Sequence, residues 1–381
     1  MMCIKYYQTF PFFKIEYINE VRVRYLVLEV VRVRYLVLDR LRKSHLDKNK
    51  NLNLTSYHKE ISHNESLFKE TQKYNEFIDA FLKNYKTKIF AYADFKNRQE
   101  VDVGGSAIIY SAYFQGWKYA LKSLDVNIND INEWDNKKVK GFINELRISC
   151  SISHPNIIKL YGVTKDPETG NFNFVMQFAN NGNLREYLQR KWSGNVFKIL
   201  LEDVFQIAKG ITLGINYLHE NGIIHRDLHS KNILIIDGKP LIADFGISKL
   251  KHTGDNYNDD NSRSEGMPAY IDPQWFNPDG KYERDERSDI YSLGVLLWEL
   301  TSGTPPFSRL TNDYAKYVIA ISIYRGEREK MITGTPQGYA DIYKNCWSLE
   351  PEKRPKLNDI LSNLYKLSTN TPVEFIINNR T

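Results

Sequence analysis

Two short segments near the middle of the chain hold oxygen-bearing side chains that could bind a cation and accept a proton. HRDLHSKN at residues 225–232 contains Asp227 and Asn232, and DFG at residues 244–246 contains Asp244. Carboxylate and amide oxygens are the ligands that Mg²⁺ prefers, and a carboxylate can take a proton from a hydroxyl group. These residue types suit chemistry on a hydroxyl group close to a hard cation.

The upstream stretch VDVGGSAIIYSAYF, residues 101–114, has the outline of a glycine-rich phosphate loop. In the pattern G-x-G-x-x-G-x-V, Gly104 keeps the middle slot, whereas Asp102 and Ala107 occupy the first and third slots. A degenerate glycine motif is a weak signal, so its meaning depends on the segments downstream.

Further segments follow in the order found in protein kinases. Lys122 lies in YALK, and Glu145 lies in FINELRISC. After DFG come GMPAYIDPQ, SDIYSLGVLLWEL and CWSLEPEKRP. Together with HRDLHSKN, these segments resemble the protein kinase domain over about residues 92–367. The chain is most similar to the tyrosine-kinase-like group, most of whose members phosphorylate serine and threonine.

The resemblance implies roles in phosphoryl transfer, which depends on charge neutralisation and in-line positioning. Lys122 would contact the α- and β-phosphates of ATP and would be oriented by Glu145. Asp227 would accept the proton of the substrate hydroxyl, while Asn232 and Asp244 would hold Mg²⁺. The implied function is an ATP-dependent protein kinase that acts on serine and threonine in intracellular signalling. The alternative is a pseudokinase scaffold, favoured by the altered glycine loop and opposed by these intact residues.

The resemblance also implies a nucleotide site. Apolar side chains would lie above and below adenine, the lobe-linking backbone would face its edge next to the gatekeeper Met176, and the glycine loop would cover the phosphates. The residues assigned to nucleotide binding are Val101, Asp102, Gly104, Gly105, Ser106, Ile109, Ala120, Lys122, Gln177, Ala179 and Leu234.

Besides Asp102 and Ala107, four positions depart from the family pattern. Ser149 falls where the helix usually offers an apolar residue to the interior. His229 stands where Lys or Ala/Arg help to separate serine/threonine from tyrosine kinases, and Met267 stands where serine/threonine kinases usually carry Thr. Gln274 replaces a Glu that normally pairs with an arginine, here Arg354. We expect the resulting Gln–Arg hydrogen bond to be weaker than an ion pair.

Other residues near the motifs are expected to have structural roles. Asp289 would anchor the backbone of the catalytic loop, His225 would pack in the core, and Gly246 would allow the sharp turn after Asp244. The polar segment between Gly246 and Gly266 carries several Ser, Thr and Tyr residues. The sequence leaves open whether phosphorylation there orders the segment.

The elements that must position these residues form an α+β pattern. Short apolar runs and helical spacing predict strands at 100–103, 107–114, 117–124, 157–163 and 172–178 and a helix at about 138–152. Beyond Asn183 the chain is predicted to be mostly helical to about residue 366. This pattern predicts a bilobal protein-kinase fold, with a strand-rich N-lobe, a helical C-lobe and an N-terminal extension.

The chain divides into four predicted parts: a basic, poorly ordered extension (1–64), an amphipathic helical segment (65–91), the kinase domain (92–367) and a C-terminal tail (368–381). We expect the residues before about 90 to be dispensable for the fold.

The extension contains a repeat, and the N-terminal quarter of the chain carries its net excess of positive charge. VRVRYLVL at 21–28 recurs at 31–38, either as two paired strands or as a product of repetitive coding sequence or a mispredicted start. Residues 1–98 carry 19 Lys and Arg but 11 Asp and Glu, so the chain's excess positive charge lies there. Such a segment is either a solvated extension or a surface for acidic partners or membranes, including a regulatory partner.

Composition places the chain among soluble globular proteins, with 42% hydrophobic and 26% charged residues. The sequence shows neither a membrane-spanning apolar run nor a secretory signal. Its three cysteines are widely spaced, which fits a reducing compartment. We therefore expect a cytoplasmic protein that binds ATP and a protein substrate, and no nucleic acid.

Overall fold

The computed structural model describes residues 82–84, 87–103, 107–124, 133–251, 267–277, 282–310, 314–372 and 374–379, with the side chains of the helix at 133–151 described from residue 140. These residues belong to one unit of the chain, residues 69–381. The repeat at 21–38, the rest of the extension 1–64 and most of the segment 65–91 lie outside the described residues. So do Gly104, Gly105 and Ser106.

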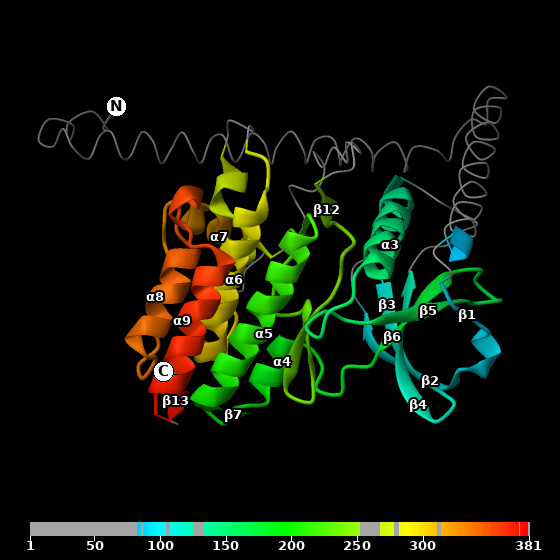
Figure 1. The fold of residues 1–381 in the computed structure, drawn as a ribbon, viewed down its shortest axis with the longest axis horizontal. Helices are drawn as coiled ribbons and strands as arrows, with labels where there is room; N and C mark the ends of the chain where they lie inside the picture. Colours follow the sequence, from blue (N-terminus) through cyan, green and yellow to red (C-terminus); the bar gives the residue numbers. More distant parts are fainter. Residues whose placement is uncertain are drawn as a thin grey trace, which may run out of the picture. The chain divides into compact units, whose positions relative to one another are not determined.

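Six strands form the sheet of the N-terminal lobe in the order β1-β5-β6-β4-β3-β2 (Figure 1). They are β1 (Ile89–Phe90), β2 (Lys96–Val103), β3 (Ala107–Phe114), β4 (Trp117–Leu124), β5 (Leu160–Lys165) and β6 (Phe172–Gln177), with a 3-10 turn, η2 (Tyr92–Asp94), after β1. All neighbours are antiparallel except β1 and β5. The strands β3 and β4 have the predicted bounds, and their pairing sets Lys122 opposite Ile109.

The two faces of this sheet bury different side chains because strand residues alternate. In β6, Val175 packs with an aromatic cluster on one face, while Phe174 and Met176 join the main core on the other. The helix α3 (Glu133–Ser151) covers this second face and begins earlier than predicted. Its Phe142 ring stacks on Phe174, with the ring centroids 4.0 Å apart.

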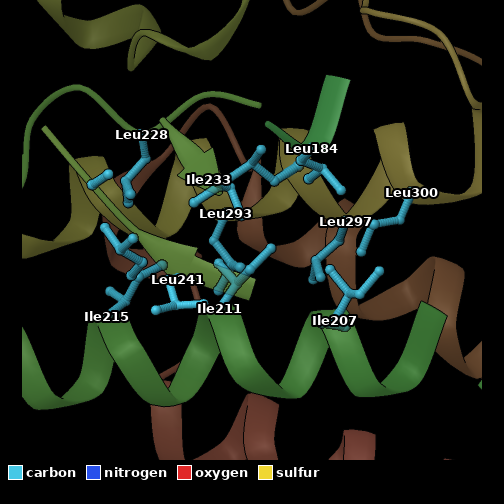
Figure 2. Close-up of a cluster of buried hydrophobic side chains, with 14 of the residues drawn as sticks. Leu184, Ile207, Ile211, Ile215, Leu228, Ile233, Leu241, Leu293, Leu297 and Leu300 are labelled. Carbon is cyan, nitrogen blue, oxygen red and sulfur yellow. The ribbon is translucent and has the colours of Figure 1, made fainter. Parts of the chain in front are cut away.

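The C-terminal lobe is built around two long helices, α5 and α6. Its helices are α4 (Leu184–Gln189), α5 (Leu201–Glu220), α6 (Glu286–Ser302), α7 (Ala315–Tyr324), α8 (Gln337–Cys346) and α9 (Leu357–Asn370), with 3-10 turns η4 (Pro268–Tyr270), η5 (Pro273–Phe276) and η6 (Pro351–Lys353). Figure 2 shows apolar side chains of α5 at four-residue spacing, Ile207, Ile211 and Ile215, facing Leu293 and Leu297 of α6. This apolar face fixes the lobe that carries the catalytic motifs.

Two short pairs of antiparallel strands hold the loops that contain these motifs. The strand β9 (Ile223–Ile224) pairs with β12 (Lys249–Leu250), and β10 (Ile233–Ile236) pairs with β11 (Lys239–Ile242). The catalytic loop leaves β9 and enters β10, and the DFG segment leaves β11 and enters β12. Each loop is therefore held at one end by a strand of the β9–β12 pair and at the other end by a strand of the β10–β11 pair.

A further sheet involves residues that were predicted to be a tail. The helix α9 extends to Asn370, and β13 (Phe375–Asn379) pairs with β8 (Val196–Leu200), which also pairs with β7 (Trp192–Ser193). Ile376 is buried, and the Asn378 amide donates to the Ser302 carbonyl at the end of α6. Residues beyond 367 thus pack against the C-terminal lobe.

Residues just before the kinase-like region also contact the fold. Leu82 is 2% exposed within the main core. The hydroxyl of Thr87 lies 3.4 Å from the Cys150 sulfur of α3, and the Lys88 carbonyl accepts from the Val163 amide of β5. The end of the predicted amphipathic segment thus joins both α3 and the sheet. Within the described part of the chain, no helix is long and apolar enough to cross a membrane.

Candidate active site

A buried lysine joins the two lobes. The Lys122 amine on β4 lies 2.8 and 2.7 Å from the two carboxylate oxygens of Glu145 on α3, and 3.3 Å from Oδ1 of Asp244. Burial alone would lower the pKa of Lys122, but the charges of Asp244 and Glu145 raise it above its ordinary value. The amine therefore stays protonated and is oriented from two sides.

The catalytic loop brings the other carboxylate and the amide together. The Asn232 amide nitrogen donates to the Asp227 backbone carbonyl at 2.9 Å and to its carboxylate at 3.2 Å. Burial and the charge of Asp244 raise the pKa of Asp227, which makes it a stronger base than an exposed aspartate.

Asp244 is held close to this loop by the backbone. The Ala243 amide donates to the Asn232 carbonyl, which ties the DFG segment to the catalytic loop. Burial would raise the pKa of Asp244, but the charge of Lys122 and its hydrogen bond lower it. With the Asn232 nitrogen engaged, its amide oxygen and the Asp244 carboxylate are the atoms suited to Mg²⁺, which is commonly held by one or two carboxylates plus substrate phosphates. This donor set fits the ion, and no cluster of three His, Cys, Asp or Glu metal ligands occurs among the described residues.

A buried aspartate from α6 anchors the catalytic loop, as the sequence predicted. One Asp289 oxygen accepts from the Arg226 amide and the other from the His225 amide, each at 2.9 Å, and His219 lies 2.8 Å from the second oxygen. Arg226 has a φ of 69°, a left-handed conformation that is unfavourable for a side chain of this size and must be held by its surroundings. The His225 ring is fully buried 5.3 Å from the Phe245 ring.

The sharp turn of the DFG segment differs from the expectation. Gly246 is absent from the described glycines with positive φ, whereas Asp244 itself has a φ of 69°. A Cβ placed on Gly246 would meet its nearest neighbour at an ordinary 3.5 Å. The left-handed residue is therefore the proposed metal ligand and not the glycine, because Asp tolerates this conformation better than most side chains.

The residues assigned to adenine come from the N-terminal sheet, from the segment after β6 and from β10 of the C-terminal lobe. Ala120 pairs with the buried Met176, and Leu234 forms a bridge to Asn183 at the start of α4. Ile109 is paired with both Lys122 and Asp102. The remaining assigned residues are Val101, which is 55% exposed on β2, and Gln177 and Ala179, which end β6 and continue into the lobe-linking segment.

Comparison with known proteins decides the family. The protein tyrosine and serine/threonine kinase family matches residues 95–364. The chain belongs to this family. A probable serine/threonine-protein kinase of Dictyostelium discoideum is 30% identical over 73% of this chain and 28% of its own length. The serine/threonine/tyrosine-protein kinase HT1 of Arabidopsis thaliana is 30% identical over 69% of this chain and 64% of its own length. The matched part of this chain thus spans less than two thirds of either relative.

One expected contact of the kinase domain is wrong. The Gln274 amide donates to the Leu349 carbonyl and does not meet Arg354. Arg354 instead forms a bidentate ion pair with Asp272, and both side chains are fully buried. The 3-10 turn η5 explains the exchange, because Asp272 is its N-cap and faces inward. Arg354 therefore still forms an ion pair, but its acidic partner is Asp272, two positions before Gln274.

Sequence reasoning missed a polar cluster beneath the catalytic loop. The Arg185 guanidinium of α4 donates to the Ser230 hydroxyl at 3.0 Å, to the Tyr270 hydroxyl at 3.1 Å and to the Met267 sulfur at 3.2 Å. Tyr270 also donates to the buried carboxylate of Glu299. No motif in the sequence links these residues, since they come from four separate elements.

The departure at His229 lies next to the proposed base. Its side chain is buried, and Nε2 lies 3.6 Å from an Asp227 oxygen. Ser248, at the start of the polar segment of the kinase domain, is also buried, and its hydroxyl donates to the His225 carbonyl. The other hydroxyl residues of that segment, from Thr253 to Ser264, lie outside the described residues.

Proposed function

We propose that this chain is an ATP- and Mg²⁺-dependent protein kinase that transfers the γ-phosphate of ATP to serine and threonine hydroxyls of protein substrates. The observation that carries the proposal is the single arrangement in which Lys122 contacts both Glu145 and Asp244 while Asn232 contacts Asp227. This arrangement supports the proposal because phosphoryl transfer depends on charge neutralisation and positioning around the phosphates.

Each residue has a defined task in this proposal. Lys122 places its positive charge on the α- and β-phosphates, and Glu145 keeps the amine in that position. Asn232 and Asp244 hold Mg²⁺, which when bound neutralises phosphate charge. Asp227 orients the substrate hydroxyl and takes its proton at Oδ. The nucleotide-binding residues assigned from the sequence, including the glycine loop, complete the site.

The cellular role is proposed from the family and the composition. We place the protein in the cytoplasm, in a signalling pathway, with the N-terminal extension as the site for a regulatory partner. Serine and threonine are the proposed acceptors because the tyrosine-kinase-like group and the names of the relatives favour them.

The alternative function is a pseudokinase scaffold, which the substitution of Asp102 and Ala107 for glycines favours. Radiolabelled ATP with a mixture of serine and threonine peptides distinguishes the two. Asp227→Asn should lower transfer roughly 10²- to 10⁴-fold while ATP binding is retained, and Asp244→Asn should also weaken Mg²⁺-dependent ATP binding. Asp341→Asn, on the exposed surface of α8, is the matched control. ATP binding without any transfer by the unaltered protein would support the scaffold.

A further inference from the structure

A buried asparagine on α3 contacts the backbone that follows Asp244. Asn144 is 8% exposed. Its amide nitrogen lies 3.0 Å from the Phe245 carbonyl oxygen, 3.3 Å from that of Gly246 and 2.8 Å from that of Ser248. Only the nitrogen end of an amide can face three acceptors, so the orientation of this side chain is fixed by its surroundings.

These contacts meet a need of the loop itself. A buried carbonyl without a donor costs free energy. The Phe245 carbonyl also accepts from the Ser248 backbone amide at 3.2 Å, so the Asn144 amide matters most for the carbonyl of the buried Ser248. The two hydrogens of the Asn144 amide are shared among three carbonyls, which is a bifurcated arrangement. The helix lies beside the loop here, since a Cβ on Gly141 would make an ordinary contact, 3.6 Å, with the Gly246 carbonyl oxygen.

The neighbouring residue on the helix makes the other essential contact. Successive residues of an α-helix point about 100° apart, so Glu145 reaches Lys122 while Asn144 reaches the DFG segment. A rotation or shift of α3 would break both sets of hydrogen bonds. Each set therefore favours the same position of the helix.

We propose that Asn144 is a positioning residue that couples α3 to the DFG segment, so that the Lys122–Glu145 pair and the metal ligand Asp244 form together. The side chain does not touch nucleotide or substrate, and it acts through the backbone of residues 245–248. The catalytic part of this inference rests on the proposed kinase function, whereas the coupling of helix to loop does not.

The test uses the full chain with Asn144→Ala and with Asn144→Ser, which keeps one donor and covers the case in which the alanine variant fails to fold. Asn173→Ala is the matched control. Asn173 is a buried asparagine of β6, and its amide donates to the Asn171 carbonyl. Three quantities are measured: amide hydrogen exchange of residues 245–250, ADP affinity in Mg²⁺ and in EDTA, and the turnover number.

In Asn144→Ala we expect amide exchange in residues 245–250 to accelerate at least about tenfold, as follows from the loss of one or two buried hydrogen bonds. The gain in ADP affinity on adding Mg²⁺ should fall by about the same factor, with affinity in EDTA changed less than about twofold. Asn144→Ser should lie between the alanine variant and the unaltered protein, and Asn173→Ala should show neither effect.

Unchanged exchange in residues 245–250, or equal changes in Asn173→Ala, would overturn the coupling. An unaltered protein without phosphoryl transfer would contradict the proposed function and leave the exchange and ADP measurements to decide the coupling alone. Turnover of Asn144→Ala equal to that of the unaltered protein, with exchange accelerated, would show that the coupling does not serve catalysis.

Discussion

The Asp272–Arg354 ion pair provides a test of what stabilises the C-terminal lobe. Asp272→Asn removes the negative charge opposite Arg354 and keeps the size of the side chain. The Arg354 guanidinium also donates to the Ser348 and Arg287 carbonyls, so it stays in place. A positive charge is then left buried without its partner.

The expected loss follows from the burial of the pair. Both side chains are 0% exposed, and removing one partner of such a pair costs about 3–5 kcal/mol of unfolding free energy. The Asp272 carboxylate also accepts from the Tyr282 hydroxyl at 2.7 Å and from the Gln274 backbone amide at 3.0 Å. An asparagine oxygen can keep some of these bonds, which places the expected loss near the lower end of that range. Against a typical total of about 5–15 kcal/mol, this change is large.

The measurement is urea unfolding at neutral pH, with Gln274→Ala as the control. Gln274 makes an exposed hydrogen bond to the Leu349 carbonyl, so its loss should cost about 1 kcal/mol or less. If Gln274→Ala destabilised the protein as much as Asp272→Asn, the assignment of the arginine's partner would be refuted. If neither variant lost stability, the pair would not matter to the fold.

Two further substitutions test the nucleotide loop and the unusual histidine. Asp102→Gly removes a negative charge from the strand leading into the glycine loop and should tighten ATP binding about five- to tenfold, less at high salt. Calorimetry at two salt concentrations measures this, and equal ATP affinities of the variant and the unaltered protein would contradict it. Burial and the nearby charge of Arg185 lower the pKa of His229 to about 4. The unfolded chain therefore takes up a proton before the folded protein does. The free energy of unfolding should fall as the pH drops from about 6.5 toward 4, by at most about 3 kcal/mol. His229→Gln should flatten this pH dependence of unfolding, and parallel profiles for the two proteins would contradict it.

Motif order predicted the kinase fold because the chemistry of phosphoryl transfer restricts which residues can occupy a few positions. The bounds of β3 and β4 followed from their apolar runs, and Lys122 contacts Glu145 as the motifs implied. The contact between Lys122 and Asp244 was not part of that prediction. The sequence predicts that Gly246 allows the sharp turn, whereas the residue with a positive φ is Asp244. Residue type alone does not identify which residue of a turn takes the unusual φ, because Asp also tolerates it.

The features that the sequence did not predict depend on contacts between distant segments. Asp272 and Gln274 are two positions apart, and only the turn of η5 decides which one faces Arg354. Asn144 reads as an ordinary polar residue on a helix, since its acceptors are backbone atoms about a hundred positions later. The strand β13, FIINN, has no alternating sequence pattern, so it is recognised as a strand only from its pairing with β8.

The pairing of β13 with β8 has a consequence for how the chain folds while it is being synthesised. The strand β8 ends at Leu200, and its partner begins at Phe375. Folding during synthesis proceeds from the N-terminal side, so α5 and α6 can pack while one side of β8 still lacks its partner. An unpaired strand edge is a site for association with other chains. Until the ribosome has made β13, β8 must therefore be shielded by other means, and this interval is when we expect the nascent chain to depend most on chaperones.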